Sequence, residues 1–188
     1  MSASNGNLVD KLTPTVMVLR IIVVALASGV MIFVAVAIWM RLSRPQPAAA
    51  DAEMLTMLAI GLAPLALIAS RIVPAILVRN ARRQIAAGHD PSPSKEGPRA
   101  PLSELGDAGA LAGVYQTKTI ISAALLEGAA FFSATAYMLE GNQIALGLSL
   151  GFAGVILTMF PSASRVAEWI AGQRRLMGEE KLLGRGDG

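Results

Sequence analysis

The sequence contains no cysteine and only one histidine, His89, which lies in a stretch rich in proline and serine. Without thiols the chain has no disulfide, thiolate nucleophile or thiolate metal site. A single loop imidazole also argues against histidine metal clusters and histidine-based catalytic triads. No phosphate-binding loop or nucleophile–base pair is recognisable either, so we expect a non-enzymatic protein without metal or cofactor.

Charged residues are scarce as well. They make up 15% of the 188 residues, against roughly 25% in soluble domains, whereas hydrophobic residues make up 54%. This balance leaves too little polar surface for a water-soluble globule of this length. The net charge of +3 is weak support for nucleic-acid binding, and we expect none. The composition predicts an integral membrane protein, with the lipid bilayer as its main partner.

Four apolar stretches approach or exceed the length of about 20 residues that a helix needs to cross a bilayer. Helix is the expected structure, because lipid offers the backbone no hydrogen-bond partners. The predicted spans are 16–40, 54–78, 119–139 and 144–160. They form two hairpins, so the predicted fold is an all-α integral membrane bundle of four transmembrane helices.

The first stretch also has an alternative interpretation as a cleaved signal peptide. The residues Ala48, Ala49 and Ala50 offer a small-residue cleavage site. The apolar run of 25 residues, however, exceeds the roughly 7–15 residues of a signal core. An uncleaved membrane anchor is therefore the expectation.

Three segments lie outside the two predicted hairpins: a tail at 1–15, a linker at 79–118 and a C-terminal segment at 161–188. Between residues 88 and 105 the linker holds four prolines among serine, glycine and charged residues, which predicts a flexible connection. The C-terminal segment spaces apolar residues near helical period among arginines and glutamates. This pattern predicts a short amphipathic helix on the membrane surface, the alternative being an ordinary solvated helix. The apolar residues are Val166, Trp169, Ile170 and Met177.

The placement of lysine and arginine predicts the orientation. With four spans, the tail, the linker and the C-terminal segment share one side, which together with Arg20 at the adjoining end of the first span holds 13 of the 16 basic residues. Only Arg41 and Arg44 fall on the opposite side, and Arg71 lies within a span. Because basic loops are retained in the cytoplasm, both termini are predicted to be cytoplasmic in a multi-pass protein of the inner cell membrane.

Glu127 and Arg71 are the charged residues predicted to lie deep within spans, whereas Arg20 is near the basic end of the first span. Each lies about eight residues from the basic end of its helix, so the two are at similar depth. A lone charge there costs ~2.5 kcal/mol or more, which predicts that the two side chains form a polar pair or that Glu127 is an ion site. An ion pair with a purely structural role remains open.

Glycines repeat along the fourth predicted span in a pattern that favours close contact between membrane helices. We expect this face to pack against another helix. Its glycines are Gly147, Gly151 and Gly154.

The run Gln116–Thr117–Lys118–Thr119, followed by IISAALLEGAAFF at 120–132, resembles the carboxylate-bearing helix of the rotary ATP synthase c subunit. The family pattern places Q-T before apolar residues and A-A-L-x-E-G. The resemblance implies that Glu127 takes the place of the ion-carrying carboxylate. The long linker, Arg71 and the four predicted spans depart from that family, so a ring rotor is not expected. As a whole, the chain resembles small four-helix bacterial membrane proteins of unknown function.

Two functions remain as expectations. The first is a non-enzymatic accessory or partner-binding subunit that forms a homo-oligomer or joins a membrane complex. The second is a proton- or ion-translocating component that uses Glu127.

Overall fold

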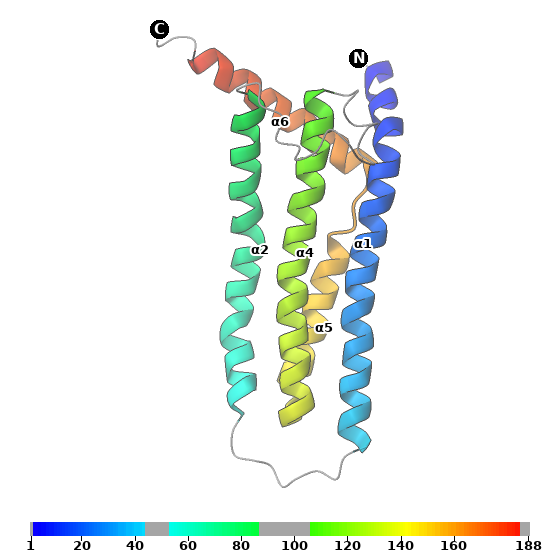
Figure 1. The fold of residues 1–188 in the computed structure, drawn as a ribbon, viewed down its shortest axis with the longest axis vertical. Helices are drawn as coiled ribbons and strands as arrows, with labels where there is room; N and C mark the ends of the chain where they lie inside the picture. Colours follow the sequence, from blue (N-terminus) through cyan, green and yellow to red (C-terminus); the bar gives the residue numbers. More distant parts are fainter. Residues whose placement is uncertain (1, 44–52, 87–105, 185–188) are drawn as a thin grey trace. The chain divides into compact units, whose positions relative to one another are not determined.

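The computed structural model describes residues 2–43, 53–86 and 106–184. Within these ranges the chain forms α-helices and no strand, which confirms the all-α prediction (Figure 1). The helices are α1 (Ser2–Ser43), α2 (Met54–Ala86), α4 (Asp107–Glu140), α5 (Gln143–Thr158) and α6 (Ala163–Gly184).

Three helices are long and apolar enough to cross a membrane: α1 from Leu12 onward, α2 and α4. A fourth crossing is obtained only if α5 and α6, which a short break separates, are taken as one broken span. By itself α5 has 16 residues, or about 24 Å at 1.5 Å per residue, less than the hydrocarbon core of about 30 Å. The structure is therefore consistent with a helical multi-pass bundle, and the fourth span remains a prediction.

The long helices continue beyond the predicted spans. The helix α1 already begins within the predicted tail, and the linker at 79–118 is helical at both ends, where α2 runs on and α4 begins. The ends of the linker contain alanine, leucine, arginine and glutamine, which favour helix. The helices can therefore continue beyond the apolar spans. The part of the linker predicted to be flexible, 88–105, lies outside the described residues.

The helices build two compact units, each with its own interior. Unit 1 combines Met1–Arg20, Pro74–Thr119 and Pro161–Gly188, whereas unit 2 combines Ile21–Val73 and Ile120–Phe160. Parts of α1, α2 and α4 belong to each unit. The fourth helix is α6 in unit 1 and α5 in unit 2.

The interior of unit 2 is apolar and close-packed. Small residues of α4 face valines of α1 and larger side chains of α5, and the aromatic rings of Phe33 and Phe131 meet edge to face with centroids 5.2 Å apart. In this unit α4 lies between α1 and α2 (Figure 1). The buried residues that share the cluster include Val23, Ala27, Val30, Ala123, Leu126, Ala130, Phe152 and Ile156.

The helix α2 is the least buried of the three long apolar helices. Its inner side is a row of small residues spaced three and four apart, whereas its remaining surface exposes methionine, leucine and isoleucine. Small side chains allow the backbones of membrane helices to approach closely, but they bury little area. Other interactions must therefore help to hold α2. The row consists of Thr56, Ala59, Ala63, Ala66 and Ser70.

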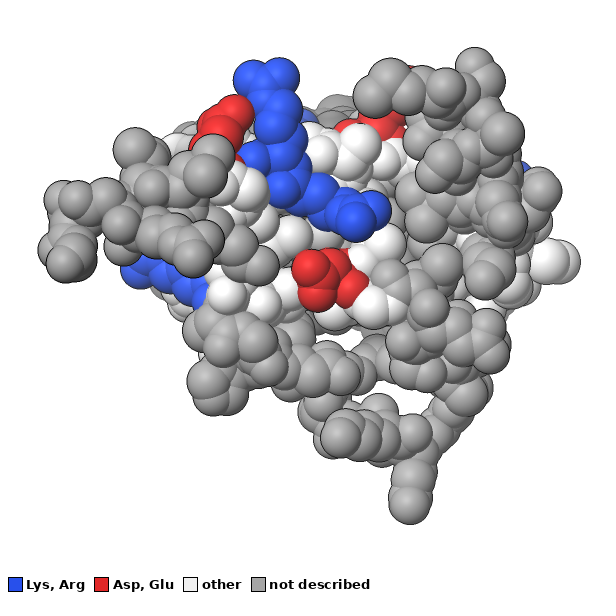
Figure 2. Space-filling model, turned by 90° about the horizontal axis from the view of Figure 1, so that it is seen from above, with Lys and Arg blue, Asp and Glu red and all other residues white. Residues whose placement is uncertain are grey.

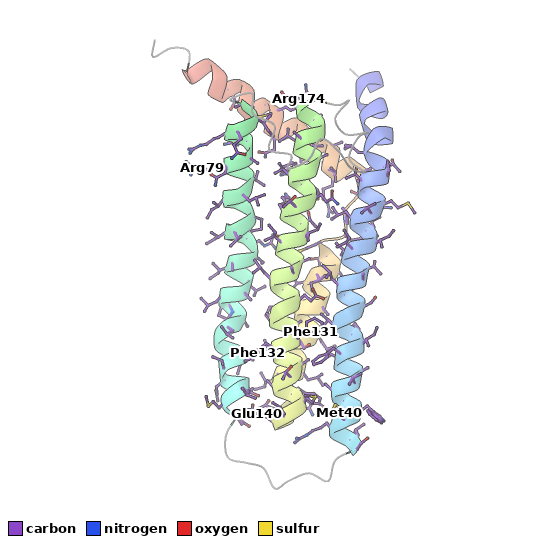
Figure 3. The ribbon with its side chains drawn as sticks, in the orientation of Figure 1. Met40, Arg79, Phe131, Phe132, Glu140 and Arg174 are labelled. Atoms are coloured by element: carbon purple, nitrogen blue, oxygen red, sulfur yellow. The ribbon has the colours of Figure 1, made fainter. Side chains whose placement is uncertain are left out.

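One such interaction comes from Glu140, the last residue of α4. Its Oε1 accepts a hydrogen bond from the backbone N–H of Leu55 at 2.6 Å, and its Oε2 accepts from the backbone N–H (2.8 Å) and hydroxyl (2.6 Å) of Thr56. These amides belong to the first turn of α2, whose N–H groups have no partner within the helix. The Glu140 carboxylate thus caps α2 from a different helix and complements its dipole (Figure 3).

Arg41 of α1 makes the complementary contact. Its guanidinium donates to the carbonyl oxygens of Leu139 and Glu140, the last residues of α4, at 3.4 and 3.3 Å. A cation at a helix C-terminus is favourable for the same electrostatic reason. The next residue, Gly141, has φ +75°, and a side chain there would collide with the guanidinium of Arg41. The two contacts tie α1, α4 and α2 together in series.

In unit 1 the apolar side of α6 faces the protein. Val166, Ile170 and Met177 are buried, as are Leu12 on α1 and Leu111 on α4, which belong to the same compact unit. The prediction of an amphipathic helix is thus confirmed, but its apolar side does not rest on lipid as we expected. The helical extensions of α1, α2 and α4 supply a protein surface that covers it.

We expect Glu140→Gln to destabilise the protein by about 1–2 kcal/mol, because the amide loses the charge that strengthens its hydrogen bonds to partly exposed N–H groups. Thermal unfolding in mild detergent measures the change. Glu179→Gln is the control, since Glu179 only pairs with the exposed Arg175 and should leave the melting temperature unchanged. Equal melting of Glu140→Gln and the wild type would contradict the capping role.

Candidate intramembrane site at Glu127

The Glu127 side chain lies between α4 and α1 within unit 2 and is partly exposed. Its Oε1 is 3.6 Å from the point that a Cβ on Gly29 would occupy, and the ring of Phe131 is 4.0 Å from the same point. Gly29 therefore leaves α1 without a side chain where the carboxyl approaches it. The absence of a side chain creates the room in which the carboxyl lies.

The surroundings of the carboxyl are apolar. Phe131 lies one turn beyond Glu127 on α4, and its partner Phe33 lies one turn beyond Gly29 on α1. Figure 3 shows Phe131 on this part of α4. In the described ranges, Glu127 forms neither a hydrogen bond nor a salt bridge with any side chain or backbone group. A buried or half-buried carboxyl without a partner contributes nothing favourable to folding.

Arg71 does not pair with Glu127, and this part of the prediction is wrong. The Arg71 side chain is exposed on α2, and no salt bridge joins the two among the residues that the structure describes. The helices meet where the Ser122 hydroxyl donates to the Ser70 carbonyl oxygen at 2.9 Å. Glu127 follows Ser122 by five residues, or about 140° around the helix at 100° per residue, and so faces α1. The Ser70–Ser122 contact also places Arg71 near the level of Ser122, whereas Glu127 lies five residues, or about 7.5 Å, farther along α4, so the predicted equal depth is wrong as well.

The glycines predicted to pack against another helix face away from the other helices of this unit. Gly147, Gly151 and Gly154 are exposed, and a Cβ at any of them would meet no atom of the chain within 4 Å. The buried side of α5 is formed instead by larger residues such as Phe152 and Ile156. With the larger side chains turned inward, α5 makes more van der Waals contacts within the bundle than its glycines could.

Two polar features of unit 2 escaped the sequence analysis. Ser122 and Ser70 connect α4 to α2, and the hydroxyl of Ser149 on α5 is buried without a hydrogen-bond partner among the described residues. Single serines and glycines are common in membrane helices, so nothing in the sequence distinguished these serines or Gly29 from their neighbours.

The described residues contain no group of three or more histidine, cysteine, aspartate or glutamate side chains that could hold a metal ion. The chemistry available at Glu127 is therefore that of a single carboxyl group. It can gain and lose a proton or accept a hydrogen bond.

A double-mutant cycle tests the separation of the two charges. Glu127→Gln and Arg71→Gln should have additive effects on unfolding, with a coupling energy within about 0.5 kcal/mol of zero, because the side chains share no contact. Glu140→Gln combined with Thr56→Ala is the positive control and should show clear coupling. Coupling between Glu127 and Arg71 of more than about 1 kcal/mol would indicate an ion pair and contradict the structure.

Comparison with known proteins identifies no relative. No protein-family model matches the chain, and no curated protein or solved structure matches it. The similarity of residues 116–132 to the c subunit helix therefore stays an interpretation of the sequence.

Proposed function

We propose that this chain is a non-enzymatic integral membrane protein in which the carboxyl group of Glu127 binds and releases a proton, as part of a proton- or ion-translocating component. The observation that carries the proposal is the position of this carboxyl against Gly29, in an apolar setting and without a cation beside it. An ionisable residue inside a membrane segment is by default a candidate for such a role.

The lack of bonds at Glu127 supports a chemical role over a structural one. An ion pair or a helix cap would give a carboxyl group in a membrane helix a structural role. Glu140 has such a role, because it caps α2. Glu127 has neither an ion pair nor a capping role, and an apolar residue at this position would have a lower free energy in the apolar site. A charged carboxylate near the centre of a span costs ~2.5 kcal/mol or more, so the proton-bound form is the cheaper one.

We place the protein in the inner cell membrane with both termini in the cytoplasm. Support comes from the excess of basic residues in the tail, the linker and the C-terminal segment. In this orientation unit 1, which contains α6, is the cytoplasmic part.

Carbodiimide labelling tests the proton-binding role, because the reagent modifies protonated carboxyl groups in apolar sites. We expect modification at Glu127, detected by peptide mass spectrometry, and no modification of Glu140, whose charged form accepts three hydrogen bonds. In liposomes, Glu127→Gln should abolish a pH-driven proton flux while the protein stays folded. Protection of Glu127 from the reagent, or an unchanged flux in Glu127→Gln, would refute the proposal.

Association with a second copy or with another membrane protein is a second candidate function, favoured by the outward glycines of α5. Gly147, Gly151 and Gly154 leave open space along one side of this helix. The backbone of another helix can approach this side of α5 closely, and membrane helices often associate through such small-residue faces.

The mass of the complex in mild detergent measures this association. Gly151→Leu should reduce the assembled fraction, because the new side chain keeps the partner helix away, whereas folding should be unaffected since the site is open. Gly61→Leu is the matched control, because Gly61 is also exposed with open space around it but lies on α2. Assembly that survives Gly151→Leu, or is lost equally in Gly61→Leu, would exclude the α5 side.

A further inference from the structure

Unit 1 holds a lysine between two aromatic rings. The Nζ atom of Lys118 on α4 lies 4.6 Å from the ring centroid of Tyr115 and 4.5 Å from that of Trp169 on α6. The two rings meet edge to face, with centroids 5.2 Å apart. Cation–π contacts hold the ammonium in place without using its three N–H donors. Lys118 is thus positioned to donate to an anion.

A second cation lies near the phenol of Tyr115. Arg165 is exposed one turn before Trp169 on α6 and is near enough to the Tyr115 phenol to interact with it electrostatically. Neither Arg165 nor Lys118 forms a salt bridge with any described residue. Basic side chains also outnumber acidic ones among the described residues of unit 1. Figure 2 shows basic and acidic side chains exposed on the side of the molecule that carries α6.

In the sequence, the α6 residues of this cluster follow shortly after the end of unit 2. The exposed Phe160 is the last residue of unit 2. It is followed by Pro161, whose carbonyl oxygen accepts a hydrogen bond from Arg20 Nε at 3.0 Å. Arg165 comes four residues later. Tryptophan and tyrosine are typical of the zone where the hydrocarbon gives way to phospholipid headgroups.

We propose that Lys118 and Arg165, supported by Tyr115 and Trp169, bind the phosphate of an anionic phospholipid headgroup. The ammonium and the guanidinium donate charge-assisted hydrogen bonds to the phosphate oxygens, and the acyl chains continue along the exposed apolar surface of the helices. A lipid is the occupant that fits, because it joins an anion to apolar chains at the point where cations join an apolar protein surface. The site is independent of Glu127.

Fluorescence quenching by brominated lipids tests the proposal. The chain has two tryptophans, so Trp39→Phe leaves Trp169 as the single fluorophore. The full chain is reconstituted in phosphatidylcholine vesicles that contain either brominated phosphatidylglycerol or brominated phosphatidylcholine. We expect stronger quenching by the anionic lipid at equal mole fraction. Lys118→Gln and Arg165→Gln should each reduce this preference about fivefold, the value expected for one basic group at an anionic surface.

Arg174→Gln is the matched control, because Arg174 is exposed on the same helix but lies outside the cluster. It should leave the preference unchanged, and so should inorganic phosphate in the buffer. Equal quenching by the two lipids, an unchanged preference in Arg165→Gln, or loss of the preference in inorganic phosphate would overturn the proposal. Arg165→Gln decides the matter even if Lys118→Gln disturbs the packing of α6, since Arg165 is exposed.

Discussion

The carboxylate of Glu140 is the contact on which the arrangement of unit 2 depends. In a bilayer no hydrophobic force drives helices together, because lipid chains are as apolar as the side chains they would replace. The helix α2 offers α4 only a row of small residues, so polar contacts determine its position. Glu140 holds the first turn of α2, and the hydrogen bond from Ser122 to Ser70 holds α2 at a second point. Arg41 links the same end of α4 to α1.

Glu127 shows the opposite use of a carboxyl group. It is on the same helix as Glu140, but it faces the bare backbone of Gly29 and has no bond that would explain it structurally. Glu140 lies beside the free N–H groups at the start of α2, whereas Glu127 lies in an apolar gap beside α1. The different surroundings of Glu140 and Glu127 thus give two carboxyl groups of one helix different roles: the first is structural, and the second is the candidate proton carrier.

Much of the fold follows from the sequence because the bilayer leaves few choices. Long apolar runs must be helices, and this predicted α1, α2 and α4. Hydropathy reports neither which way a residue faces around its helix nor the register between neighbouring helices, and the mistaken ion pair and the outward direction of the α5 glycines have this cause. Arg71 and Glu127 lie at different levels and face apart, and the glycines of α5 turn outward. The apolar side of α6 is covered by protein, since the long helices extend past the predicted spans.

The central claim is that Glu127 faces α1 at Gly29 and not Arg71 on α2. Because the chain has no cysteine, introduced pairs of cysteines can be cross-linked without background. The most direct measurement compares Gly29→Cys/Glu127→Cys with Arg71→Cys/Glu127→Cys in membranes, using a short thiol-specific cross-linker. Efficient linkage of positions 29 and 127, with little between 71 and 127, is the predicted result. The reverse pattern would contradict it.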